Sequence, residues 1–228
     1  MKKVIYTLNV NGYSKEITTM TYPLMKRYAD KIGADFTIIN KRKFPGWPIP
    51  YEKLQIYELG KNNDWNIYID SDAVIHPDFF DVTMFLNKNT VMHRASDMAA
   101  NRFRYDKYFL RDGRSIGSCN WFTIASDWCI DLWHPLDDMT LDQALENITP
   151  TNNELKTVIT REHLIDDYVL SRNIAKFGLK FKTFLQLQVE LGIQSDTYFW
   201  HEYVCTTQQK VEMIRTILTK WKLDEYIV

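Results

Sequence analysis

The first third of the chain alternates between short apolar runs and helix-like patterns, and this order restricts the possible folds most strongly. Strands are predicted at residues 4–8, 35–39 and 65–70, and helices at residues 21–32 and 51–59. Gly33 and Gly60 follow the two helical segments, where glycine commonly ends a helix. A strand–helix–strand–helix–strand order predicts parallel strands joined by helical crossovers, and therefore an α/β fold.

The later segments are less regular, but they continue the mixture of strands and helices. Strands are predicted at residues 91–93, after a loop within 117–125, and at 181–185, and helices at 126–133, 142–147, 161–177 and 206–223. The segment 149–153 is predicted to be a loop because it is rich in Thr, Asn and Pro. The terminal helix has an apolar stripe and both signs of charge on its polar face, which favours packing on the core over membrane binding.

Composition excludes several classes of protein. With 228 residues and a formal net charge of -1, the chain is predicted to be one domain without an electrostatic attraction for nucleic acid. The three cysteines (Cys119, Cys129, Cys205) form no CxxC pair, so a zinc site or disulfide framework is not expected. The apolar run after Met1 is too short for a signal peptide, and no run is long enough to span a bilayer. These features predict a cytoplasmic protein.

Two aspartates follow the third predicted strand, in the stretch Ile67-Tyr68-Ile69-Asp70-Ser71-Asp72. Alternation along a strand would place Asp70 and Asp72 on one face at its carboxyl end, where open α/β sheets bind ligands. Adjacent carboxylates repel each other unless a cation lies between them, and a hard divalent ion prefers oxygen ligands. The segment therefore indicates a metal–diphosphate site. The alternative is a chance triplet in a solvated turn, and the apolar residues on both sides argue against it.

Two segments on the N-terminal side of this motif are candidates for nucleotide binding. The polar loop 9–14 follows the first strand, but the chain has neither GxGxxG nor a P-loop motif, and a simple connecting loop is the alternative. Lys53 lies on the helix before the third strand and is placed to reach a diphosphate oxygen, unless it is an ordinary solvated lysine.

Further candidates lie in the second half of the chain. Asp166 and Asp167 near a helix start are a candidate general base or an ordinary acidic first turn. His201, in an aromatic run, is a candidate third metal ligand or a packed structural histidine. The basic and aromatic stretch 102–114 is a candidate clamp for an anionic leaving group or acceptor, or a surface loop.

Taken in order, these segments resemble the metal-dependent glycosyltransferases of the GT-A superfamily. A first strand and polar loop (4–14) come first, and a helix carrying Leu54-Gln55-Ile56-Tyr57 precedes the strand 67–75, whose Asp70-Ser71-Asp72 is similar to the family's DxD motif. Asp166-Asp167-Tyr168-Val169-Leu170 is similar to its Glu-Asp-x-x-Leu helix, and His201 to a metal-binding His. The resemblance covers residues 1–205. Asp166 replaces the usual Glu, and the His-x-x-Gly-x-x-Lys motif of glycogenin-like members is absent, so no subfamily is assigned.

The resemblance implies a single-domain GT-A fold with a Rossmann-like nucleotide-binding half (1–90), an acceptor and sugar-pocket half (91–205) and a terminal amphipathic helix (206–228). It implies Mn²⁺ or Mg²⁺ on Asp70, Asp72 and His201, and two catalytic residues, with Asp167 in the position of the catalytic base and Asp166 as the acidic residue before it. Segment 117–122 would line the sugar pocket. The residues implied to bind the nucleotide sugar are Thr7, Asn9, Asn11, Lys53, Asp70, Ser71, Asp72 and Asn120.

The implied reaction transfers a sugar from a UDP- or GDP-sugar to a hydroxyl of a glycan or another acceptor. Two alternatives stay open. A nucleotidyltransferase that makes a nucleotide sugar shares this type of sheet and metal use, but the first loop lacks the expected basic residues. A non-catalytic sugar-binding protein of the same fold is the other alternative.

Overall fold

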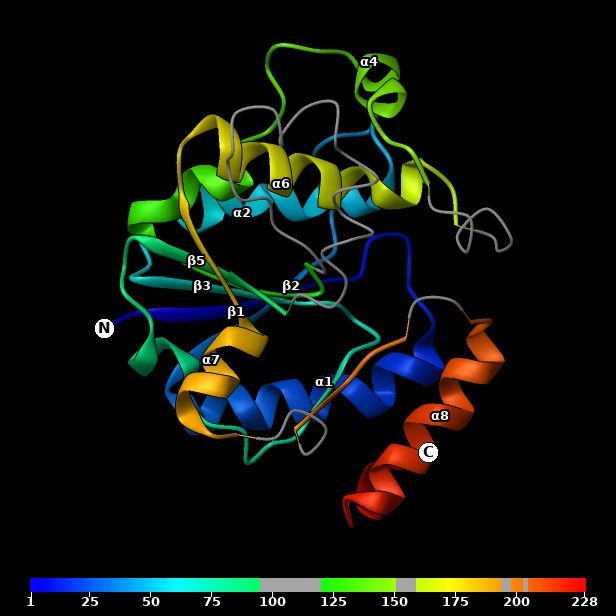
Figure 1. Cartoon of the computed structure of the whole chain (residues 1–228). Helices are drawn as coiled ribbons and strands as arrows, with labels where there is room; N and C mark the ends of the chain where they lie inside the picture. The colour runs from blue at the N-terminus through cyan, green and yellow to red at the C-terminus, as the bar shows by residue number, and fades with distance from the viewer. Residues whose placement is uncertain (95–119, 151–158, 194–197, 203–204) are drawn as a thin grey trace.

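The computed structural model describes residues 1–94, 120–150, 159–193, 198–202 and 205–228 (Figure 1). Its strands are β1 (Lys3–Leu8), β2 (Ala34–Ile39), β3 (Trp65–Ile69), β4 (Val74–Ile75), β5 (Thr90–His93), β6 (Phe122–Ser126), β7 (Lys180–Thr183) and β8 (Phe199–Trp200). The α-helices are α1 (Lys15–Ile32), α2 (Ile56–Leu59), α4 (Leu141–Glu146), α6 (Ile165–Lys176), α7 (Phe184–Leu191) and α8 (Thr207–Lys220). Short 3₁₀ helices are η1 (Ile49–Gln55), η2 (Val82–Phe85), η3 (Asp127–Trp133), η4 (Glu162–Leu164) and η6 (Asp224–Tyr226).

Within the described residues, six strands form one sheet in the order β2-β1-β3-β6-β5-β7, and β4 pairs with β8 separately. The pairings β1–β2, β1–β3 and β5–β7 are parallel, whereas β6 is antiparallel to both β3 and β5. The sheet is therefore mixed and mainly parallel, and helices flank it (Figure 1). This confirms the fold class predicted from the strand and helix order.

Alternating side chains of the sheet fill two apolar layers. Val4, Tyr6 and Leu8 of β1 face the layer that contains residues of η1, η3 and α6, while Ile5 faces the layer of α1 and α7. Figure 1 shows α2 and α6 on one side of the sheet and α1 and α7 on the other. The period-2 alternation of strands β1 and β3 thus places an apolar row on each face.

The terminal helix α8 packs on the rest of the protein. The sequence predicted this packing because the polar face of the helix carries both signs of charge. Its apolar residues Val211, Ile214 and Leu218 are fully buried in a cluster with residues of α1 and with Val74 of β4. Arg215 extends this contact by pairing with Glu16 at the start of α1 (3.3 Å). This packing brings Lys210, near the start of α8, into an ion pair with Asp72, which follows the carboxyl end of β3.

Several predicted elements differ from the structure for identifiable reasons. Helix α1 begins at Lys15 instead of residue 21, because the Ser14 side chain caps it by accepting from the Ile17 amide. The segments predicted as helices at 51–59 and 126–133 are largely 3₁₀ helices, and the segment predicted at 161–177 begins with η4. The strand predicted at 181–185 ends at Thr183, which starts α7 with a capping box to Gln186.

Candidate metal and nucleotide site

Asp70, Ser71 and Asp72 form a turn between β3 and β4, which we call the aspartate turn. Strand β3 ends at Ile69, and the Ala73 amide donates to the Asp70 carbonyl (3.0 Å). The two carboxylates are therefore brought together by a turn and not by strand alternation, which corrects the reasoning from the sequence. The turn lies at the carboxyl ends of the parallel strands β1 and β3, the edge where α/β sheets bind ligands.

The middle residue of the aspartate turn anchors it to β1 and α1. The Ser71 hydroxyl donates to the Leu8 carbonyl and lies 3.1 Å from the Thr7 hydroxyl and 3.2 Å from that of Tyr22. The Thr21 hydroxyl donates to the Ser71 carbonyl (2.6 Å). Thr7 and Ser71, both predicted to contact the nucleotide, are buried, and these contacts fix the position of the turn.

Pairing of β4 with β8 brings His201 to the aspartate turn. Val74 pairs with Trp200, so the residue after Trp200 lies beside the turn although it is far away in sequence. His201 Nε2 is 3.3 Å from Asp72 Oδ1 and 3.8 Å from Asp70 Oδ2, and its ring stacks on Trp121 at 4.9 Å. One ligand atom from each of Asp70, Asp72 and His201 lies within 4.8 Å of the others. The sequence prediction that these three residues meet agrees with this geometry.

Each carboxylate of the aspartate turn has its second oxygen bound by other side chains. Tyr68 donates to Asp70 Oδ1 (2.6 Å), and Lys53 Nζ lies 3.5 Å from the same oxygen. Tyr13 donates to Asp72 Oδ2 (3.0 Å), and Lys210 of α8 forms an ion pair with it. Asp70 Oδ2 and Asp72 Oδ1 are the oxygens that face His201. Partners on the outer oxygens orient carboxylate ligands toward a shared centre.

Asp72 is held in its ionised form despite its burial. Only 8% of the residue is exposed, and burial alone would raise its pKa. The charges and hydrogen bonds of His201 and Lys210 outweigh burial and hold the pKa of Asp72 well below its ordinary value. The pKa of the Tyr13 hydroxyl is raised by burial and by Asp72, so this group stays a hydrogen-bond donor.

Lys53 connects Asp70 to the second predicted acidic pair. It is 2% exposed, forms an ion pair with Asp166, and donates to the side-chain oxygen of Asn120 (3.1 Å). Asn120 in turn donates to Asp166 Oδ2 (3.1 Å). Burial lowers the pKa of Lys53, but Asp166 and Asp70 outweigh it and raise the pKa above its ordinary value. Lys53 is thus a buried cation between two carboxylates and not a solvated surface lysine.

Asp166 and Asp167 both lie in the first turn of α6 and are both buried. Adjacent helical residues diverge by about 100°, and the contacts to Lys53 and Asn120 are made by Asp166. Asp166 therefore belongs to the network of the aspartate turn. The assignment of Asp167 as the acceptor-side base stays a prediction.

The first loop supplies a contact to this site, although not through the residues chosen from the sequence. Asn9 accepts from the Tyr13 amide (2.7 Å), which shapes the loop, and exposed Asn11 has a positive φ of 63°. Tyr13 is the loop residue that reaches Asp72. Thr7 contacts Ser71 of the aspartate turn, and the contacts of Thr7, Asn9 and Asn11 to a nucleotide stay predictions.

Sequence reasoning missed Tyr13, Tyr68 and Lys210 as members of the site. Tyr68 is the one with a local signal, because it precedes Asp70 by two residues in the same strand. Lys210 lies 138 residues from Asp72, and only the packing of α8 brings the two together. Of the predicted pocket segment 117–122, the described part is 120–122, and the stretch 102–114 lies outside the described residues.

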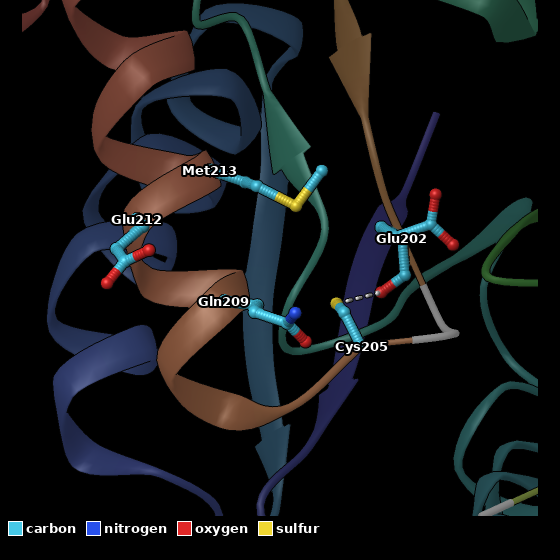
Figure 2. Close-up of a pocket in the computed structure, with 5 residues that line it drawn as sticks. All are labelled: Glu202, Cys205, Gln209, Glu212 and Met213. Carbon is cyan, nitrogen blue, oxygen red and sulfur yellow. Dashed lines mark hydrogen bonds between the residues drawn. The ribbon is translucent and has the colours of Figure 1, made fainter. Parts of the chain in front are cut away.

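A hollow of about 330 Å³ opens beside the start of α8 (Figure 2). It is lined by Glu202, Cys205, Gln209, Glu212 and Met213. Figure 2 shows Gln209 and Met213 extending from α8 toward Cys205, whose thiol contacts the Glu202 carbonyl at 3.8 Å. Because two carboxylates line this hollow, its charge does not suit a diphosphate.

The residues of the aspartate turn fit a divalent cation. Two carboxylate oxygens and an imidazole nitrogen converge, and Mn²⁺ and Mg²⁺ accept such oxygen-rich ligand sets. Asp72 is a buried carboxylate, and a second carboxylate close by makes a shared cation favourable. The chain thus offers three converging ligand atoms to such a cation.

The structure is similar to several solved glycosyltransferases over most of its length. One is a glycosyltransferase involved in glycosylation of the major capsid of PBCV-1 (14% identity, TM-score 0.49, 93% of this chain and 98% of that chain). Another is the galactosyltransferase LgtC in complex with donor and acceptor sugar analogues (12%, 0.48, 79% and 73%). A third is a mutant of Drosophila β1,4-galactosyltransferase 7 with manganese, UDP-Gal and xylobiose (10%, 0.45, 94% and 80%). Since no TM-score reaches 0.5 and the identities are low, these likenesses say nothing about the chemistry of this chain.

No protein-family model and no curated protein sequence matches the chain. Among the residues that the structure describes, no helix combines the length and apolar character needed to cross a bilayer.

Proposed function

We propose that this protein is a metal-dependent glycosyltransferase that moves a sugar from a nucleotide diphosphate sugar, UDP- or GDP-linked, to an acceptor hydroxyl. The observation that carries the proposal is the convergence of Asp70, Asp72 and His201 at the carboxyl ends of β1 and β3. A cation site at this edge, beside a first loop that contributes Tyr13, suits a diphosphate better than a neutral ligand.

In this proposal Asp70, Asp72 and His201 hold Mn²⁺ or Mg²⁺. When bound, the metal supplies Lewis acidity to the leaving diphosphate. Tyr68 and Tyr13 keep the two carboxylates oriented by hydrogen bonds to their outer oxygens. Tyr13 of loop 9–14 contacts Asp72, and Trp121 of segment 120–122 stacks on His201. We assign the loop to the nucleotide and the segment to the sugar.

The acceptor side is assigned to the start of α6. Asp167 is the proposed general base, and such a group contributes a factor of roughly 10² to 10⁴ in rate. Asp166 is the proposed positioning residue, because its contacts with Lys53 and Asn120 connect this helix to Asp70.

The decisive experiment measures release of nucleoside diphosphate from a panel of UDP- and GDP-sugars, with and without Mn²⁺. Slow metal-dependent hydrolysis of at least one donor is the expected result, because water replaces a missing acceptor. Release of pyrophosphate from a nucleoside triphosphate and a sugar phosphate would instead identify a nucleotidyltransferase. If the protein binds the metal but shows neither activity, the result contradicts an enzymatic role and favours a sugar-binding protein.

The site assignment is tested by Asp72→Asn. This variant keeps the size of the side chain but removes a charged ligand, so metal-dependent turnover should be abolished while the protein stays folded. Asp78→Asn is the matched control, since the Asp78 side chain is 70% exposed. Full activity of the Asp72 variant would refute the metal site.

A further inference from the structure

Lys210 occupies an unusual position for a lysine. It is the fourth residue of α8, near the helix end that carries a partial positive charge and disfavours cations. Its side chain is only 12% exposed, and its ammonium group pairs with Asp72. Burial and the helix dipole both oppose a charge at this position, and the carboxylate of Asp72 offsets them.

The geometry divides the two oxygens of Asp72 between two kinds of partner. Oδ2 receives Lys210 and the Tyr13 hydroxyl, while Oδ1 faces His201 and the proposed metal position. A metal on Oδ1 would therefore share one carboxylate with an ammonium group a few Å away. Two cations at that separation repel each other, and the partly buried setting screens this repulsion less than bulk water does.

We propose that Lys210 is a resident counter-ion of the metal site, which keeps the affinity for a bare divalent cation low and favours its entry together with an anionic diphosphate. This inference rests on the proposed function, because it requires a metal on the aspartate turn. The same positive charge that repels the metal attracts the diphosphate. By linkage, Lys210 then makes the binding of each ligand depend on the other.

Helix α8 is positioned to make this charge a fixed part of the site. Val211, adjacent to Lys210, is fully buried against α1 and β4 together with Ile214 and Leu218. The capping box between Thr206 and Gln209 fixes the first turn. Lys210 is thus presented by a packed helix and not by a free surface chain, so little ordering is needed on binding.

The first test compares Mn²⁺ binding to the apoprotein by calorimetry in the wild type and in Lys210→Met. Removal of the ammonium group should tighten binding of Mn²⁺ alone about tenfold. Lys210→Arg keeps the charge and should bind Mn²⁺ like the wild type. Lys220→Met is the matched control, because it makes the same change at the exposed far end of the same helix.

The second measurement is the binding of UDP and GDP at saturating Mn²⁺. Lys210→Met should lower the affinity for the nucleotide that the wild type binds more tightly by about tenfold. The coupling free energy between metal and nucleotide should therefore fall. Lys220→Met should leave both affinities unchanged. An unchanged or weaker Mn²⁺ affinity in Lys210→Met would overturn the inference while leaving the proposed function intact. Absence of Mn²⁺ binding in the wild type would overturn both.

A third readout uses the wild type alone and does not depend on a variant that folds. Acylation of lysines by an amine reagent, followed by mass spectrometry, should be slow at Lys210 because the group is paired and mostly buried. Mn²⁺ alone should speed its labelling several-fold by weakening the pair with Asp72, while Lys220 stays unchanged. Equal labelling of Lys210 with and without bound Mn²⁺ would contradict the proposed repulsion.

Discussion

Both aspartates of the aspartate turn pair with a lysine, but the two lysines occupy very different surroundings. Lys53 is 2% exposed and lies among Asp70, Asp166 and Asn120, under the ring of Tyr68 at 4.4 Å. Lys210 comes from the last α-helix and pairs with Asp72 at the edge of the site. On the proposals above, we expect the Asp70 side to contribute mainly to stability and the Asp72 side to respond to a bound ligand.

The largest expected effect is a loss of folding stability when the buried lysine on the Asp70 side is replaced. Lys53→Met leaves the buried carboxylate of Asp166 and the partly exposed carboxylate of Asp70 without their shared cation, and removal of one partner from a buried pair costs about 3–5 kcal/mol of unfolding free energy. Urea unfolding at neutral pH measures it. Lys88→Met is a matched control, because Lys88 also lies between two aspartates, Asp64 and Asp127, but its side chain is 30% exposed. A Lys53 variant no less stable than the Lys88 variant would refute this role of the Asp70 side.

The next largest effect is expected on the affinity for the metal ion that Asp70 and Asp72 are proposed to share. His201→Ala removes the one nitrogen ligand that faces both carboxylates, so we expect Mn²⁺ affinity to fall about a hundredfold. Calorimetric titration of the apoprotein measures the change. His134→Ala is the control, since His134 packs against Tyr57 and Phe177 away from the site. If His201→Ala binds Mn²⁺ as the wild type does, His201 is a packed structural histidine.

A smaller loss is expected from the tyrosine on the Asp70 side. Tyr68→Phe keeps the ring over Lys53 but removes the hydrogen bond to Asp70 Oδ1, and such bonds to charged groups contribute about 1.5–3 kcal/mol. The change should appear as a lower urea midpoint with an unchanged slope. A variant as stable as the wild type would show that Lys53 alone satisfies Asp70.

Local sequence patterns predicted the N-terminal half of the fold, because strands β1, β2 and β3 are short apolar runs bounded by glycine or polar residues. They failed at α7, where Phe184 and Leu185 extend an apolar run and the capping pair Thr183–Gln186 was the available signal. The convergence of Asp70, Asp72 and His201 was predictable from the family resemblance, which places these residues in this order. The two lysine environments were not, because the burial of Lys53 and the contact of Lys210 with Asp72 depend on packing between distant segments.

The smallest effect is expected at Tyr13. This variant best distinguishes the effect of the Lys210 charge from the effect of orienting the Asp72 carboxylate. Tyr13→Phe removes a neutral donor from the same Asp72 oxygen that Lys210 contacts. Because Tyr13 is 38% exposed, the loss of stability should be about 0.5–1 kcal/mol. Its effect on Mn²⁺ should have the opposite sign to that of Lys210→Met, because a neutral donor orients the carboxylate without repelling the metal. A weakening of about tenfold or less, measured by calorimetry, fits this account, whereas tighter binding would show that any group on that oxygen competes with the metal.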